Sequence, residues 1–500
     1  MKPVNIYALT RISDPDKLEL LEKQMSKRRR SLNVKRWETE GLKSLCTELE
    51  KVLVSASDLD FYYSFTMPKL GKEFDLLRVN EDSVVNIELK SGNVTEEAIK
   101  KQLLKNRYYL AMLGRHMHFY TYISNEKRLL RLTHGMRLVE TDFSELALIL
   151  ENQKDCYDGH IEELFKEDKY LISPLSDPGR FLRQEYFLTS QQNDIKRKIL
   201  RACRTDNDKP LVQGFTGLPG TGKTILLYDI AMQLSFNDSV CILHFGSHEK
   251  ELAELDLRLK RIDFYYVDSE SLERDGITGM KKDYSAILID EGHRISKEAL
   301  DAILSYAKAL KAPVIFSYDK EDAVSPIERG SYGARFIEAI PGYTRYQLTN
   351  RIRMNTELSA FIGLLMCIKG RNHRHDYPSV SLAYSNDPSE AKKILKKYIS
   401  SRYIYIFDNS LSDTCIPDCE ETLRIEAGEA TCKEFDNVIM LIDSSFFYDE
   451  EGYLRSADTE SSKNCFSVKN LFHGLSRAKK KIALLVLDNN TIFSELLNLF

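Results

Sequence analysis

The stretch GLPGTGKT, residues 217–224, combines residue types that bind phosphate. Its glycines let successive backbone N–H groups curl around phosphate oxygens, and the helix-like run KTILLYDIAMQL that follows adds the positive end of a helix dipole. Lys223 can reach the terminal phosphates as a point charge, and the Thr224 hydroxyl can ligate Mg²⁺. The spacing predicts a phosphate-binding loop for ATP with Mg²⁺. Its nucleotide-binding residues are Gly217, Gly220, Thr221, Gly222, Lys223 and Thr224.

An acidic pair, Asp290 and Glu291, follows the apolar run at residues 286–289. Continuous apolar runs are typical of buried parallel strands, and nucleotides bind outside the carboxyl ends of such strands. We expect Asp290 to hold Mg²⁺, directly or through water, and Glu291 to polarise the attacking water. Together with the upstream loop, this pair predicts an ATPase site.

A second kind of chemistry is suggested by Asp75, Glu88 and Lys90, which form a D…ExK pattern in which Asp75 precedes Glu88 by thirteen positions. Two strands, residues 74–79 and 84–90, joined by a polar turn would place Glu88 and Lys90 on one face, where they can converge with Asp75. Carboxylates so arranged hold Mg²⁺ or Mn²⁺ beside a phosphate, and the lysine orients or activates water. The pattern predicts a metal-dependent phosphodiesterase site, although an exposed charge pair also gives ExK.

The amino-acid composition limits the classes of protein that are compatible with these predictions. The 500 residues suggest about three domains, and the 43% hydrophobic and 29% charged content is ordinary for a soluble globular chain. The net charge of −4 gives no global signal for nucleic acid, so local patches must carry such contacts. Residues 27–30, with Lys35 and Arg36, form a candidate phosphate-binding stripe, or alternatively a solvated helix face.

The compartment and the domain limits follow from the same inspection. Nine cysteines without regular spacing fit a reducing compartment, and the absence of a long apolar run or signal peptide predicts a cytoplasmic protein without a membrane segment. We expect a nuclease-like domain with a basic N-terminal segment at residues 1–150 and a connector at 151–185. Two α/β lobes with parallel sheets are expected at 186–345 and 346–500.

The order of short motifs from residue 186 onward resembles the motif series of superfamily 1 helicases, particularly the compact group related to the Schlafen C-terminal domain. The motifs are FLTSQQ, GLPGTGKT, ILIDEGH, FSYDKED, LTNRIRMN, EATCKEFDNVIM and LFHGLSRAKKKIALLV. The resemblance implies two RecA-like lobes, in which Gln192 reads adenine and Asp319 belongs to the nucleotide site. It also implies that Arg353 and Arg477 approach the γ-phosphate as arginine fingers.

Two departures from that helicase pattern bear on its motor activity. Asp322 stands where the third motif has a glutamine, and Cys432 and Lys433 stand where the fifth has Gly-Gln. An ionised acid cannot donate a hydrogen bond to phosphate, and a cysteine can block the close approach of a strand that glycine permits. We expect translocation or remodelling rather than long-range unwinding.

The N-terminal pattern is similar to the PD-(D/E)xK nuclease core of the RecB-like or nuclease-related kind, over about residues 36–125. The resemblance implies that the helix after the strand pair adds Gln102 and Tyr108. It also implies that an upstream helix adds an acid to the metal site, for which Glu40 is preferred to Glu48.

The chain is therefore expected to be an ATP-dependent nuclease or translocase that acts on nucleic acid, on DNA in preference to RNA. Such an architecture is associated with DNA repair or antiviral defence, and a homo-oligomer or a partner protein is compatible with it. The alternative is a nucleotide-driven sensor or remodelling ATPase whose nuclease-like domain only binds nucleic acid.

Overall fold

The chain forms two compact units, Met1–Tyr170 and Leu171–Phe500, which we refer to as unit 1 and unit 2. They are seen in a computed structural model that describes residues 1–28, 32, 36–166, 169–175, 177–204, 211–245, 249–267, 283–319, 324, 333–349, 356–368, 376–407, 423–427, 430, 433–457 and 467–500. Among these residues, no helix has the length and apolar character that crossing a membrane requires.

Unit 1 is built on one sheet in which seven strands follow one another in chain order. Strands β4 and β5 are parallel, because helix α4 (Glu96–Leu110) carries the chain back between them, and all other neighbours are antiparallel. The predicted strand pair at 74–79 and 84–90 is confirmed as β3 and β4. The strands are β1 (Val4–Asn5), β2 (Asp60–Met67), β3 (Lys72–Val79), β4 (Ser83–Lys90), β5 (His116–Ile123), β6 (Arg128–Leu132) and β7 (Leu138–Thr141).

The two faces of β4 have different neighbours because its side chains alternate. Val85, Ile87 and Leu89 belong to the core that includes the apolar stripe of α3, whereas Asn86 and Glu88 face α4. A polar pair is thus held inside the unit beneath a helix that can offer it hydrogen bonds. The remaining helices of unit 1 are α1 (Ile6–Thr10), α2 (Pro15–Ser26), α3 (Arg36–Glu50), α5 (Phe143–Asn152) and the short η1 (Ala56–Asp58), η2 (Ala111–Leu113) and η3 (Ile161–Glu163).

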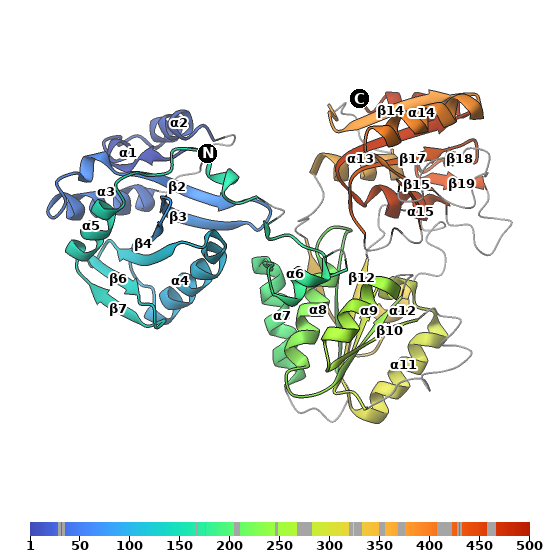
Figure 1. Ribbon diagram of the computed structural model, residues 1–500, viewed down its shortest axis with the longest axis horizontal. Coiled ribbons are helices and arrows are strands. Elements are labelled where there is room, and N and C mark those ends of the chain that lie inside the picture. The colour runs from blue at the N-terminus through green and yellow to red at the C-terminus, as the bar shows by residue number, and fades with distance from the viewer. Residues whose placement is uncertain are drawn as a thin grey trace. The chain divides into compact units, whose positions relative to one another are not determined.

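The first lobe of unit 2 is a six-stranded parallel sheet of order β10-β9-β11-β12-β8-β13. Helices α7 and α8 cover one face and α11 the other (Figure 1), which explains why the central strands β9, β11 and β12 are buried on both faces. The strands are β8 (Val212–Gly217), β9 (Val240–His244), β10 (Ile262–Tyr266), β11 (Ala286–Asp290), β12 (Val314–Asp319) and β13 (Thr344–Leu348). The helices are α6 (Pro178–Leu182), α7 (Ser190–Cys203), α8 (Lys223–Leu234), α9 (Glu249–Arg258), η5 (Gly292–Arg294), α11 (Lys297–Leu310) and α12 (Gly333–Glu338).

The second lobe contains a five-stranded parallel sheet of order β14-β20-β17-β15-β16 and a separate hairpin, β18-β19. With it, the predicted α/β class with two parallel-sheet lobes is confirmed. The strands are β14 (Val380–Ser385), β15 (Ile404–Phe407), β16 (Arg424–Glu426), β17 (Phe435–Ile442), β18 (Phe446–Tyr448), β19 (Leu454–Ser456) and β20 (Ala478–Leu487). The helices are α13 (Thr356–Met366), α14 (Pro388–Ser400), α15 (Ser467–Leu475) and α16 (Asn490–Leu497).

The segment expected to be a connector, residues 151–185, is packed onto the two units along much of its length. Phe165 lies against Phe65, with ring centroids 5.1 Å apart, and the Tyr170 hydroxyl donates to the Pro68 carbonyl at 3.1 Å. Phe181 belongs to the core of the first lobe of unit 2. Residues 151–185 therefore have a polar composition overall but contain buried aromatic residues that anchor them to both units. The first-lobe sheet also runs beyond the expected limit of 345, because β13 pairs with β8 as far as Leu348.

Candidate functional site

The phosphate-binding loop lies between the end of β8 and the start of α8. Gly220 and Gly222 have φ angles of 77° and 78°, in the left-handed region that favours glycine. A Cβ atom on Gly217 would lie 2.6 Å from the Thr221 Oγ1 and 3.0 Å from the Leu348 Cβ. All three motif glycines are thus required by the backbone path or by close packing. Thr224 follows Lys223 in the first turn of α8 and is half-buried.

Lys223 is already engaged in this loop. Its Nζ donates to the carbonyls of Gly217 and Leu218, both at 3.2 Å, and forms an ion pair with Asp319 at the end of β12. Burial alone would raise the pKa of the Asp319 carboxyl, but Lys223, His473 and Arg477 together hold this pKa below its usual value. Asp319 is therefore an ionised acid inside the lobe, and its nearest cation is the lysine of the phosphate loop.

Asp290 and Glu291 stand at the carboxyl end of β11, as the apolar run before them predicts. The Asp290 Oδ1 accepts the Glu291 backbone N–H at 3.1 Å, and its Oδ2 lies 3.5 Å from the His244 Nδ1. Glu291 has a φ of 56°, an uncommon angle for a residue with a side chain. The chain turns sharply here, which ends the strand and separates the directions of the two carboxylates.

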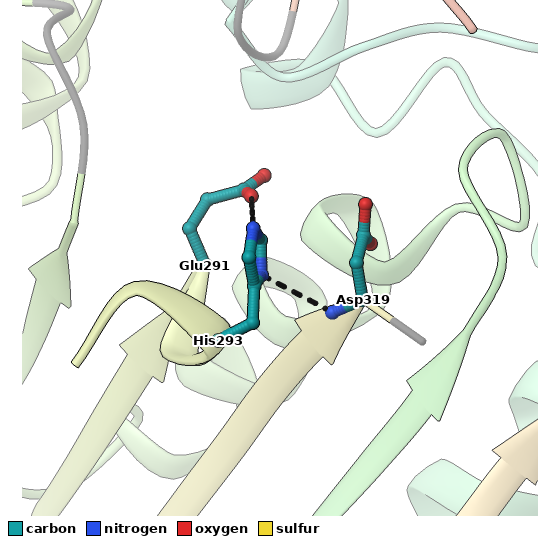
Figure 2. A group of neighbouring side chains, drawn as sticks. All are labelled: Glu291, His293 and Asp319. Carbon is teal, nitrogen blue, oxygen red and sulfur yellow. Dashed lines mark hydrogen bonds and ion pairs between the residues drawn. The ribbon is translucent and has the colours of Figure 1, made fainter. Parts of the chain in front are cut away.

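A histidine that the sequence reasoning did not identify lies beside this pair. His293 is buried in η5, and its Nδ1 accepts the Asp319 backbone N–H at 3.3 Å. Its Nε2 lies 3.6 Å from the Glu291 Oε2, as Figure 2 shows. One donor atom from each of Glu291, His293 and Asp319 lies within 4.8 Å of the others, which is the spacing of a candidate metal site.

The second lobe supplies two basic residues to this region of unit 2. The His473 ring of α15 stacks on the His293 ring, with centroids 5.6 Å apart and an angle of 19° between their planes. Its Nδ1 lies 4.0 Å from the Asp319 Oδ2, and the Arg477 charge also acts on Asp319. Arg477 thus lies close enough to act on the acid that pairs with Lys223, and its role as an arginine finger stays a prediction. Arg353, like Asp322 and Cys432, falls outside the described residues.

The side chain of Gln192 is already hydrogen-bonded within the protein. It is fully buried at the start of α7, where its Oε1 accepts the Thr189 N–H at 2.8 Å in a capping box. Its Nε2 donates to the carbonyls of Thr221 and Gly222 at 3.0 Å and 3.2 Å. The amide therefore ties α7 to the phosphate-binding loop, and adenine reading by Gln192 stays a prediction.

In unit 1, the structure brings together Asp75, Glu88 and Lys90. The register that pairs Leu76 with Ile87 places Asp75 opposite Glu88 when it is continued by one residue. Burial, together with the negative charge of Glu88, raises the pKa of Asp75 to about 7, against the opposing charge of Lys90. Asp75 Oδ2 accepts the Leu89 N–H at 2.8 Å. The half-buried Asp75 and the buried Glu88 thus lie together with Lys90 nearby, and both acids also act on the buried Lys72, whose pKa burial lowers.

Glu88 is held by three side-chain amides. The Asn106 Nδ2 donates to its Oε1 at 2.7 Å, the Asn86 Nδ2 lies 3.3 Å from the same oxygen, and the Gln102 Nε2 donates to its Oε2. Gln102 therefore contacts Glu88, as the resemblance implies. Asn86 and Asn106 were not identified, although Asn86 lies two positions before Glu88 on the same strand face and Asn106 lies one helical turn after Gln102.

The remaining predicted residues of unit 1 lie outside this cluster. Glu40 is exposed on α3, and Glu48 forms ion pairs with Lys51 and Lys127 at 2.5 Å and 3.2 Å. Glu38, two positions before Glu40, acts with Asp75 on the buried Tyr63 and adds to the rise in the pKa of that hydroxyl, which is due chiefly to burial. The role of Glu40 as a metal ligand stays a prediction. Tyr108 is exposed on α4.

The candidate basic stripe is only partly described. The Arg28 Nε donates to the buried Glu22 at 3.1 Å, and its Nη2 donates to the Tyr63 carbonyl at 2.5 Å. Arg28 is therefore engaged in hydrogen bonds inside unit 1, and a phosphate-binding role of the stripe stays a prediction. Residues 29–30 and Lys35 lie outside the described residues.

No protein-family model matches the sequence, and no curated protein matches it. Among solved structures, unliganded Pif1 from Bacteroides sp is similar with a TM-score of 0.35 and 10% identity, over 62% of this chain and 96% of that chain. Pif1 helicase from Candida albicans gives a TM-score of 0.35 and 11% identity, with 60% and 94% covered. Bacteroides Pif1 helicase in complex with ADP-AlF3 and ssDNA gives 0.30 and 12%, with 60% and 92% covered. At these values, the likeness assigns neither a family nor an activity to this chain.

Proposed function

We propose that this protein is an ATP-dependent nucleic-acid enzyme, in which unit 2 hydrolyses ATP and unit 1 cleaves phosphodiester bonds. The observation that carries the ATPase half is the gathering of Lys223, Asp290, Glu291 and Asp319 at the carboxyl ends of three neighbouring parallel strands. Loops at this edge of an open α/β sheet bind nucleotides. The glycines whose backbone forms the loop are those of a phosphate-binding motif.

Each residue has a role in the proposed ATPase reaction. Lys223 binds the terminal phosphates, for which it leaves Asp319, and Glu291 orients and activates the attacking water. Thr224 and Asp290 would hold Mg²⁺, which neutralises the charge that develops on the phosphates. Arg477, half-buried and close enough to act on Asp319, stabilises the transition state from the second lobe. Arg353 is proposed for the same role on the motif resemblance alone.

The nuclease half rests on Asp75 and Glu88. Two neighbouring carboxylates attract a divalent cation, since its charge offsets both the burial and the negative charge of Glu88 that raise the pKa of Asp75. Mg²⁺ or Mn²⁺ held there would generate the nucleophile and stabilise charge on the scissile phosphate. Lys90, whose charge reaches Asp75, would orient the phosphate or the water. The partner is proposed to be nucleic acid, DNA in preference to RNA, and the setting DNA repair or antiviral defence in the cytoplasm.

One set of assays tests both halves. ATP hydrolysis should be measured for the parent, Lys223→Ala and Glu291→Gln, with Asp301→Asn as control, because Asp301 makes only an exposed ion pair with Lys297 in the same lobe. Cleavage of single- and double-stranded DNA and RNA should be measured with Mg²⁺ and Mn²⁺. ATP turnover lost in both site variants but not in the control supports the ATPase site. Hydrolysis by a parent that cleaves none of the four substrates would instead favour the remodelling ATPase.

A further inference from the structure

We propose that His293 is a positioning residue for Glu291 and that His473 connects it to the second lobe. This inference rests on the proposed ATPase function and adds to it the link between the catalytic glutamate and the lobe that carries Arg477. Glu291, His293 and Asp319 lie side by side at the ends of β11 and β12 (Figure 2).

The hydrogen bonding of His293 defines which ring nitrogen faces Glu291. Because the Nδ1 accepts the Asp319 backbone N–H at 3.3 Å, the neutral ring carries its proton on Nε2. That nitrogen lies 3.6 Å from the Glu291 Oε2, so an N–H points toward a carboxylate oxygen across a gap that a small side-chain movement closes. His293 thus connects the backbone of one strand end to the carboxylate of the next.

The same geometry argues against a metal ion at these three residues. A protonated Nε2 has no lone pair to offer a metal, and the Nδ1 lone pair is already used by the Asp319 N–H. Asp319, the third candidate ligand, forms an ion pair with Lys223. The spacing of 4.8 Å is therefore explained by the hydrogen bond of His293 and the ion pair of Asp319 rather than by a metal site.

The side-chain contacts of Glu291 matter because its backbone alone does not fix its carboxylate. Glu291 adopts a left-handed backbone conformation, with φ of 56° and ψ of 34°, between the last residue of β11 and the first turn of η5. Its carboxylate is carried on a flexible side chain, and a general base acts efficiently only when it is held within reach of the proton that it removes. The His293 Nε2–H can hold one carboxylate oxygen and leave the other for water.

His473 extends this arrangement to the second lobe. Its ring stacks on His293, and its Nδ1 lies 4.0 Å from the Asp319 Oδ2. The position of α15 is fixed closely, since a Cβ on the neighbouring Gly474 would lie 2.5 Å from the Met440 Sδ of β17. A shift of the second lobe therefore moves the surface against which His293 packs. Lobe position and the placement of Glu291 are coupled through two stacked rings.

The test compares two His293 variants of similar size in the full-length protein. His293→Gln can still accept with its Oε1 and donate with its Nε2, whereas His293→Leu fills the space without either bond. We expect His293→Leu to lower the kcat for ATP by about 10²-fold with KM changed less than about twofold, as for a misplaced general base. His293→Gln should recover at least about a tenth of the parent kcat. Thermal unfolding of each variant separates loss of activity from loss of fold.

The link to the second lobe is tested with His473→Ala. It should lower kcat by about 3- to 10-fold in the parent but have no further effect in His293→Leu, because residues that act as a unit are not additive. Equal kcat for His293→Leu and the parent, or additive losses, would overturn the inference. A parent without ATPase activity, or Glu291→Gln with the parent rate, would overturn the proposed function itself. If His293→Leu does not fold, equal kcat and KM for His293→Gln, His473→Ala and the parent would overturn the inference.

Discussion

Asp75 in unit 1 is half-buried and Asp319 in unit 2 is buried, both beside other functional groups, yet their surroundings act on them in opposite ways. Burial and Glu88 raise the pKa of Asp75 to about 7. Asp319 experiences the same penalty of burial, but Lys223, His473 and Arg477 outweigh it and keep its pKa low. Asp75 lacks sufficient positive charge nearby to offset its burial, whereas Asp319 already has it.

This difference indicates what each site is built to bind. The Asp75 site has two carboxylates, the lysines Lys72 and Lys90, and three neutral amides around Glu88, and burial disfavours the charged forms of both Asp75 and Lys72, so that a divalent cation would complete it. The Asp319 site is already neutralised by the lysine of the phosphate-binding loop. An incoming phosphate must compete with Asp319 for that lysine. Under the proposed function, the first site would bind a cation, and in the second a nucleotide phosphate would replace Asp319 as the partner of Lys223.

The largest effect is expected for the carboxylates of unit 1. Asp75→Asn or Glu88→Gln should lower metal-dependent cleavage at least about 10³-fold, because each removes a charged ligand from the metal. ATP hydrolysis should be unchanged in both variants. The measurement is cleavage of a labelled oligonucleotide, with Asp82→Asn in the exposed turn between β3 and β4 as the matched control. Unchanged cleavage by both site variants would remove this site from the account.

Loss of the lysine should affect both activity and stability of unit 2. Lys223→Ala should abolish ATP hydrolysis and destabilise the lobe by about 3–5 kcal/mol, because it leaves Asp319 buried without its cation. The double variant Lys223→Met with Asp319→Asn should recover the stability but not the activity. Urea unfolding and steady-state turnover measure the two effects. A double variant as unstable as Lys223→Ala would show that the pair does not hold Asp319 in the lobe.

The pH dependence of stability should have opposite signs at the two aspartates. A raised pKa means that the metal-free folded state of unit 1 loses stability as the pH rises from about 4 to about 7, with no recovery above that range. Asp319, with its lowered pKa, contributes stability that is present above about pH 4 and lost only in more acidic solution.

Asp75→Asn should accordingly raise the free energy of unfolding of metal-free unit 1 at about pH 8, on the order of 2–4 kcal/mol, with little change at about pH 4. Thermal unfolding in the presence of a chelator, across this pH range, measures the difference. Equal stability of variant and parent at the higher pH would mean that burial and the charge of Glu88 do not disfavour the ionised Asp75.

A smaller effect is expected for Gln192, which ties the loop that carries Lys223. Gln192→Ala should weaken the binding of ATP and of GTP to the same extent, by about 3- to 10-fold. The reason is that the substitution removes hydrogen bonds to the phosphate-binding loop and does not remove a contact to the nucleotide base. The ratio of KM values for ATP and GTP decides between this role and adenine reading. A loss of affinity for ATP but not for GTP would show that the Gln192 side chain leaves the loop and contacts adenine.

The sequence predicts well whatever is local in the chain. The phosphate-binding loop is one continuous motif whose glycines follow from backbone angles, and the strands around it are continuous apolar runs because both faces are covered. The strand pair that carries Asp75 and Glu88 follows from alternation across a polar turn.

The features that the sequence did not predict depend on distant residues. His293 and His473 are 180 positions apart and meet only through the fold of unit 2, so no local spacing marks them as a pair. The connector was assigned from its polar composition, which conceals the few aromatic residues, such as Phe165 and Phe181, that anchor it. The contacts of Gln192 to the loop also join segments that are far apart in sequence.

The most direct test of the contrast between the two aspartates is a calorimetric titration of Mn²⁺ into nucleotide-free protein at about pH 8. The parent and Asp319→Asn should bind Mn²⁺ with the same affinity, and Asp75→Asn should lose this binding by about 10²-fold or more. Mn²⁺ binding that survives in Asp75→Asn and disappears in Asp319→Asn would contradict the account, because it would place the cation site at Glu291, His293 and Asp319.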